Sequence, residues 1–125
     1  MKTREIPRDE WSAFFDGFSR RHEGWIASLE VFGPDTGAQT EERALPLKGV
    51  TAELGEGDGD SIQIMFGAGP DDHVTHSITR PVEVSLEQTE EGADEALAIK
   101  SADGVTALLN FRSAVLPELV DGVVT

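Results

Sequence analysis

The chain has 125 residues, no Cys, and 24 Asp and Glu against 10 Lys and Arg, which gives a formal net charge of −14 at pH 7. These values exclude disulfides, thiolate metal sites and cysteine nucleophiles, and they disfavour nucleic acid as a partner because its phosphates would be repelled. No apolar run is as long as a membrane span and the start lacks the hydrophobic stretch of a signal peptide, so we expect a cytoplasmic protein without a membrane partner.

The aromatic residues predict one amphipathic helix near the N-terminus. Four of them recur at i, i+3, i+4 and i+7, the spacing of one helical face: Trp11, Phe14, Phe15 and Phe18. We expect the helix to run from Pro7 to His22, with Ile6 packed on Trp11 and with Gly24 ending it in a left-handed conformation. Such a stripe could line a ligand groove, but it is more typical of core.

The segment after the helix predicts short strands. Residues 25–32 are bulky on both faces, which indicates a strand covered on both sides, and we expect the helix to pack on it. Residues 33–40 are rich in Gly, Pro and Asp and predict a loop. The apolar alternation of residues 45–47 then slips by one position at 50–54, so we expect a bulge or corner at 48–49.

Two more strands are predicted between turns. Residues 62–66 alternate between apolar and polar after a turn at 56–60, and residues 74–78 alternate after a turn at 67–72. Pro81 indicates the end of the second strand, because proline cannot donate to a sheet.

The last third of the chain predicts its own strand register. A hairpin centred on residues 91–92 pairs apolar residues with apolar residues and an acidic residue with a basic one: Leu86 with Leu97, Val84 with Ile99, and Glu83 with Lys100. For the next hairpin, a three-residue loop with Gly104 left-handed sets Leu97 opposite Leu109, whereas a two-residue loop would set it opposite Asn110. Residues 82–112 are therefore predicted to form a three-stranded antiparallel meander.

Together these elements predict a single α+β domain at residues 1–112. Its N-terminal amphipathic helix packs on a curved antiparallel sheet or a small β-barrel of about seven strands. Residues 113–125 are apolar but broken by Pro117 and Gly122, and we treat them as a C-terminal tail.

His73 and His76 are the most conspicuous candidates for a metal site. On a strand, however, residues three apart point to opposite faces, so we do not expect this pair to chelate a metal. His76 shares its face with apolar neighbours, which favours a partly buried histidine hydrogen-bonded nearby. A site that combines His76 with His22 or with a distant carboxylate stays open.

The acidic clusters carry weaker signals. Glu56, Asp58 and Asp60 could ligate Ca²⁺, but they lack the ordered spacing of a calcium loop, and the glycines between them lack the context of a phosphate-binding loop. A second acidic group at a predicted hairpin tip is typical of a solvated loop: Glu87, Glu90, Glu91, Asp94 and Glu95. We assign no catalytic, cofactor-binding or metal residue from these patterns.

Three segments carry a resemblance to a known family: EIPRDEWSAFFDGFSRRHEGW, HSITRPVEVSLEQTEEGADEALAIKSADG and ALLNFR. The sequence resembles, over residues 5–112, a family of small acidic bacterial proteins known only as a domain of unknown function. The resemblance implies a soluble bacterial domain. It supplies no activity, substrate or site residue, and residues 113–125 lie outside it.

The sequence therefore favours a non-enzymatic binding or regulatory module of the bacterial cytoplasm, because no convergent acid, base and nucleophile can be recognised. Its partner would be an unknown protein or small molecule, and the chain itself a monomer or weak homodimer. The alternative is a hydrolase or metal-assisted enzyme that uses His76 with acidic loop residues. Convergence of His76, His22 and a carboxylate in one pocket would favour the enzyme.

The charge balance allows three interpretations. Acidic excess with few Lys is expected of a protein from a salt-rich cytoplasm, where cations screen the repulsion. An ordinary acidic protein from an organism with Arg-rich coding fits equally well. Mimicry of nucleic acid is a third interpretation, although the acidic residues show no phosphate-like repeat.

Overall fold

The computed structural model describes residues 2–34, 37–55, 59–69 and 72–111. Over these residues it confirms an α+β fold with one N-terminal helix on an antiparallel sheet. The sheet they form is open, not a barrel, and has eight strands in the order β1-β6-β7-β8-β2-β3-β4-β5. The elements are β1 (Lys2–Ile6), η1 (Arg8–Glu10), α1 (Trp11–His22), β2 (Ile26–Gly33), β3 (Gly37–Glu53), β4 (Ser61–Gly69), β5 (Asp72–Thr79), β6 (Pro81–Gln88), β7 (Asp94–Ser101) and β8 (Thr106–Phe111). No helix in these ranges is long and apolar enough to cross a membrane.

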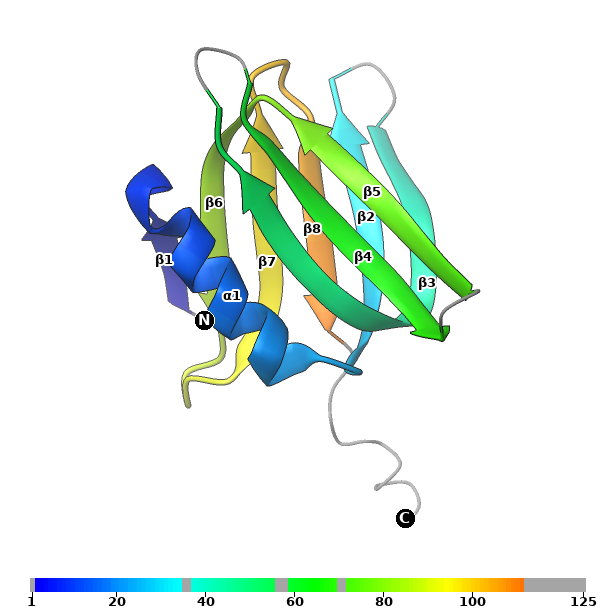
Figure 1. Cartoon of the computed structure of the whole chain (residues 1–125). Coiled ribbons are helices and arrows are strands. Elements are labelled where there is room, and N and C mark those ends of the chain that lie inside the picture. Colours follow the sequence, from blue (N-terminus) through cyan, green and yellow to red (C-terminus); the bar gives the residue numbers. More distant parts are fainter. Residues whose placement is uncertain (1, 35–36, 56–58, 70–71, 112–125) are drawn as a thin grey trace.

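The long strand β3 folds the sheet back on itself. Its first part pairs with β2 and its second part with β4. The predicted bulge is confirmed, since the register between β3 and β4 shifts between Leu47 and Gly49. As a result, the end of β3 together with β4 and β5 lies in front of β6, β7, β8 and β2 (Figure 1), and α1 covers one end of the space between the two layers.

The predicted helix is confirmed as η1 followed by α1, but it packs against a different strand from the one we expected. Its main neighbour is β3 and not β2. Ser19 accepts a hydrogen bond from the Val50 amide at 2.8 Å and donates one to the Val50 carbonyl at 2.9 Å. A Cβ at Gly49 would lie 3.2 Å from the Ser19 hydroxyl, so glycine permits this close approach.

Both ends of the helix follow their sequence signals. Trp11 Nε1 donates to the Ile6 carbonyl at 2.8 Å, and both residues are buried. Gly24 has a φ of +85° and turns the chain toward β2. Trp25, predicted to start the strand, instead precedes it and is 38% exposed.

Two predicted loops are shorter than expected. β2 and β3 remain paired up to Gly33 and Gly37, and β4 continues to Gly69. Apolar alternation stops before these strands do, because the ladder of backbone hydrogen bonds does not require apolar side chains. The strand β1 was also missed, since four of its five residues are exposed and three are charged.

The predicted meander of residues 82–112 is confirmed in its register. Leu86 faces Leu97, Leu97 faces Leu109, and Gly104 has a φ of +90°. These leucines join the aromatic stripe of α1 in one core, which lies between the two layers. The tail at residues 113–125 lies outside the described residues.

Candidate functional site

The two histidines of the predicted H-x-x-H pair lie on β5. His73 is exposed, whereas His76 is half-buried with its ring 6.3 Å from that of Phe66. Within the described ranges, no group of three or more His, Asp or Glu side chains is placed to hold a metal ion. Of the acidic turn, Glu56 and Asp58 lie outside those ranges.

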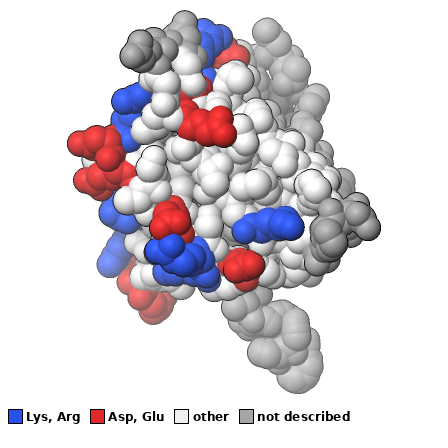
Figure 2. Space-filling view, viewed as in Figure 1, with Lys and Arg blue, Asp and Glu red and all other residues white. Residues whose placement is uncertain are grey.

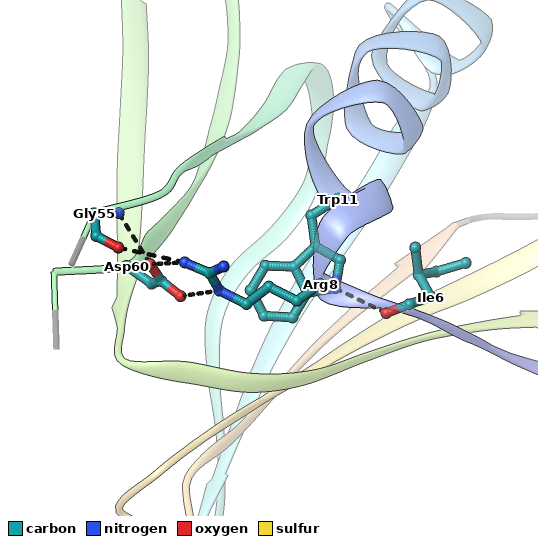
Figure 3. A network of polar contacts seen from close by, with 5 residues as sticks. All are labelled: Ile6, Arg8, Trp11, Gly55 and Asp60. Atoms are coloured by element: carbon teal, nitrogen blue, oxygen red, sulfur yellow. Dashed lines mark hydrogen bonds and ion pairs between the residues drawn. The ribbon is translucent and has the colours of Figure 1, made fainter. Parts of the chain in front are cut away.

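Asp60, the third member of that turn, forms an ion pair with the start of the helix (Figure 3). Arg8 binds it with two hydrogen bonds, from Nε to Oδ2 at 2.7 Å and from Nη2 to Oδ1 at 2.8 Å. The Gly55 amide also donates to Oδ1, at 3.0 Å. The hydrogen bond from Arg8 holds the pKa of Asp60 below its usual value. This carboxylate therefore joins η1 to the segment between β3 and β4.

His22 and His76 lie in separate hollows. His76 faces a hollow of about 220 Å³ between β5 and the strands behind it, which we call the β5 hollow: Leu29, Val31, His76, Ser77, Ile78, Thr79, Ser101, Asp103, Val105 and Ala107. The convergence that would favour an enzyme is thus missing for these two histidines.

His22 lies at the base of a wider groove of about 660 Å³ at the C-terminal end of α1. We call it the Trp25 groove and define it by its lining residues: Arg4, Arg21, His22, Trp25, Leu86, Gln88, Gly92 and Asp94. These come from β1, α1, the segment before β2, β6 and the hairpin between β6 and β7. The groove is therefore assembled from elements far apart in the sequence.

Both ring nitrogens of His22 are engaged. Nδ1 lies 2.7 Å from the Phe18 carbonyl oxygen, which can only accept, so Nδ1 carries a proton. Nε2 lies 3.0 Å from Oδ2 of Asp94, and the His22 side chain is 2% exposed. The other oxygen of Asp94 accepts a hydrogen bond from Gln88 at 2.9 Å. The pair thus ties α1 to the hairpin between β6 and β7.

Trp25 stands over this pair at the surface. Its ring is roughly perpendicular to the His22 ring, with the centroids 4.5 Å apart, and to the Phe111 ring, with the centroids 5.4 Å apart. The His22 ring also stacks on Phe111 at 4.7 Å with an interplanar angle of 8°. The exposed indole therefore rests on the buried His22 ring and the partly buried Phe111 ring, which fix its orientation.

Burial lowers the pKa of His22 below its usual 6.5, whereas the Phe18 carbonyl and the Asp94 carboxylate oppose the shift by favouring the charged ring. The unfolded chain then takes up a proton before the folded one, so the contribution of His22 to stability is present above pH 6.5 and is lost as the pH falls below it.

We expect Asp94→Asn to lower the pKa of His22 further, because the variant removes the carboxylate that favours the charged ring. Titration of the histidine ring signals by NMR in wild type and variant measures the shift. A higher pKa of His22 in the variant would contradict the assigned effect of Asp94.

The sequence pointed to little of this groove. The sequence pattern predicts a solvated acidic loop for Asp94 and a strand for Trp25, and it places His22 at the end of the helix and as an open partner for His76. The available signal was the position of His22 in the last turn of the helix, three residues before an aromatic residue. Nothing in the sequence showed that Asp94 would meet it.

The fold and the groove define a small α+β domain whose exposed aromatic and cationic groups surround a buried His–Asp pair. The chain belongs to the family of unknown function DUF5335, whose model matches residues 2–118. It is similar to an uncharacterized protein of Aquifex aeolicus, with 29% identity over 119 residues that cover 94% of this chain and all of that protein. No solved structure matches it. The expected family resemblance is thereby confirmed, although the match extends beyond residue 112, where we expected it to end, to residue 118.

Proposed function

We propose that this protein is a non-enzymatic binding module that holds an acidic segment of a protein partner in the Trp25 groove. The observation that carries the proposal is the exposed indole of Trp25, 38% accessible, in a groove that two arginines also line. Trp and Arg are the residues most enriched among those that dominate protein interfaces. A shallow groove of this kind suits a peptide segment better than an enclosed small molecule.

The charges of the groove support an anionic partner. The Arg21 side chain is 54% exposed and its Nη2 lies 3.7 Å from Asp94. The Arg4 guanidinium lies 5.7 Å from the centre of the Phe14 ring. In a chain with a net charge of −14, such guanidinium groups are the places where a carboxylate can approach favourably.

The chemistry of the groove supports binding over catalysis. The histidine is buried and both of its ring nitrogens face oxygen atoms of the protein, so neither can reach a substrate proton. Among the residues that the structure describes, none of those lining the groove is a Ser, Thr, Lys or Tyr that could act as a nucleophile. The alternative is a hydrolase built on His76. The acidic residue that lines the β5 hollow with His76 is Asp103, and its carboxylate already accepts a hydrogen bond from Ser101.

Selection of random displayed peptides on the purified protein tests the proposal. We expect enrichment of peptides that combine Asp or Glu with an aromatic or Leu residue, and binding that weakens as salt rises. Trp25→Ala should weaken the selected peptides by about tenfold or more, equivalent to ~1.4 kcal/mol, because an anchor of the interface is lost.

Two further variants make that result specific. Arg4→Gln with Arg21→Gln keeps most of the side-chain packing and should weaken binding while removing its salt dependence. Val82→Ala, which changes an exposed apolar residue on β6 outside the groove, should leave binding unchanged. Failure to select acidic peptides, or equal weakening by Val82→Ala, would refute the proposed site.

A further inference from the structure

The two edges of the open sheet differ in charge. At one edge, β1 carries Lys2, Arg4 and Glu5. Charged side chains on an edge strand hinder pairing with another chain, and natural proteins commonly protect edges in this way. At the other edge, β5 begins with one acidic residue, Asp72, but has no Lys, Arg, Asp, Glu or Pro from His73 to Thr79. The edge formed by β5 therefore lacks the protection that β1 has.

The absence of charge extends from β5 onto its neighbour. The whole of β4, from Ser61 to Gly69, is also free of charged residues, although 34 of the 125 residues of the chain are charged. Figure 2 shows the consequence, since the surface over β4 and β5 is white while blue and red side chains gather toward the helix. Within the described ranges, β5 pairs only with β4.

We propose that two copies of this chain associate through the β5 edge, pairing β5 with β5 across a twofold axis to form one continuous antiparallel sheet. Two molecules with a net charge of −14 repel each other wherever their acidic surfaces meet, so they can approach most closely at a surface without charges. A basic or acidic peptide would find no complementary charge there. A twofold axis also lets the same edge serve as both donor and acceptor.

The sequence of β5 selects one register for this pairing. A twofold axis normal to the sheet must pass through the level of a residue, because facing residues then point to the same side. An axis at His76 sets like residues opposite each other: Val74 with Ile78 and Thr75 with Ser77. Both pair types stabilise antiparallel strands. An axis at Thr75 would place Val74 opposite His76, and an axis at Ser77 would place Val74 opposite Arg80. Neither register pairs Val74 with another apolar residue.

Sedimentation velocity of the full chain tests the association. We expect a dimer whose fraction rises with protein concentration and with KCl, because salt screens the repulsion between copies. Thr75→Lys with Ser77→Lys should abolish the dimer, since the lysines protect the edge. The same variant reduces the net negative charge, so its effect cannot come from stronger long-range repulsion.

A matched variant controls for the added charge. Thr3→Lys with Ser12→Lys adds the same two charges at exposed positions on β1 and α1 and should leave the dimer intact. A chain that stays monomeric at about 1 M KCl, where charges are screened beyond roughly 3 Å, would refute the proposal. So would a dimer that the lysines at Thr75 and Ser77 leave unchanged.

Disulfide cross-linking tests the register. Because the chain has no native Cys, only the introduced cysteines can form a disulfide. A mixture of Thr75→Cys and Ser77→Cys chains should form disulfide-linked dimers on oxidation, because facing Cα atoms lie about 4.5–5.5 Å apart. Each variant alone should cross-link far less, because equal residues would then be diagonal neighbours about 7–8 Å apart. Equal cross-linking in all three samples would reject the register.

This surface is separate from the Trp25 groove, so the two proposals can fail independently. The variant with Thr75→Lys and Ser77→Lys should still bind the selected peptides. The variant with Arg4→Gln and Arg21→Gln should still form the dimer. Loss of both properties in either variant would indicate misfolding, which far-UV circular dichroism and thermal melting of each variant detect. A folded lysine variant that remains dimeric contradicts the interface.

Discussion

Phe18→Ala is expected to lower the free energy of unfolding by about 3–5 kcal/mol. The Phe18 side chain has 0% exposure, and the centre of its ring lies 4.2 Å from that of His22 and 5.7 Å from that of Phe111. Truncation would leave a cavity between α1 and the end of β8, and the packed surroundings cannot close it. Urea unfolding of wild type and variant measures the difference.

Phe14 offers the matched control for this prediction. It lies one turn earlier on the same helix and stacks on Phe18 at 5.5 Å, but it is only half-buried. Phe14→Ala should therefore cost clearly less than Phe18→Ala, although both remove the same atoms. A loss below about 1 kcal/mol for Phe18→Ala would contradict its role as core, because full burial of a ring is worth more than that.

Raising KCl from about 0.1 M to about 1 M is expected to increase the melting temperature by several degrees. The screening length falls from roughly 10 Å to roughly 3 Å over this range, which relieves repulsion among the 24 acidic side chains. Salt also strengthens apolar burial, so a near-neutral domain of equal size must serve as the reference. The part of the increase in melting temperature that exceeds the increase in the reference domain measures the relief of charge repulsion.

Association through β5 would add its own stabilisation as KCl rises. Melting should therefore be repeated with the Thr75→Lys and Ser77→Lys variant and at two protein concentrations, because only the contribution of a dimer depends on concentration. A melting temperature that stays flat over the same range of KCl would favour an ordinary acidic protein over one adapted to a salt-rich cytoplasm.

Local sequence patterns predicted the elements whose side chains alternate strongly. The stripe from Trp11 to Phe18 predicted the helix, and the pairing of Leu86, Leu97 and Leu109 predicted the register of the meander. Both patterns arise from burial of one face, and burial acts on each residue with a fixed period. The strand β1 escaped notice because its exposed, charged residues show no such period.

The candidate site could not be predicted in the same way. Its key pair joins His22 on α1 to Asp94 at the start of β7, 72 positions later in the chain. An aspartate in an acidic hairpin has the same local pattern whether it faces water or a buried histidine. Only the packing of α1 across the layers decides between these environments, and this packing also leaves Trp25 at the surface.

The sequence by itself determined the class of the fold, the amphipathic helix and the register of the final meander, because hydrophobic periodicity and turn chemistry are local properties. The tertiary structure decided that the sheet stays open, that α1 rests on β3, and that His22 meets Asp94. These features depend on the bend of β3 at residues 44–49, where a register shift and the positive φ of Ala44 redirect the strand. Such a bend positions residues that are distant in the sequence, and no local pattern encodes which of them will meet.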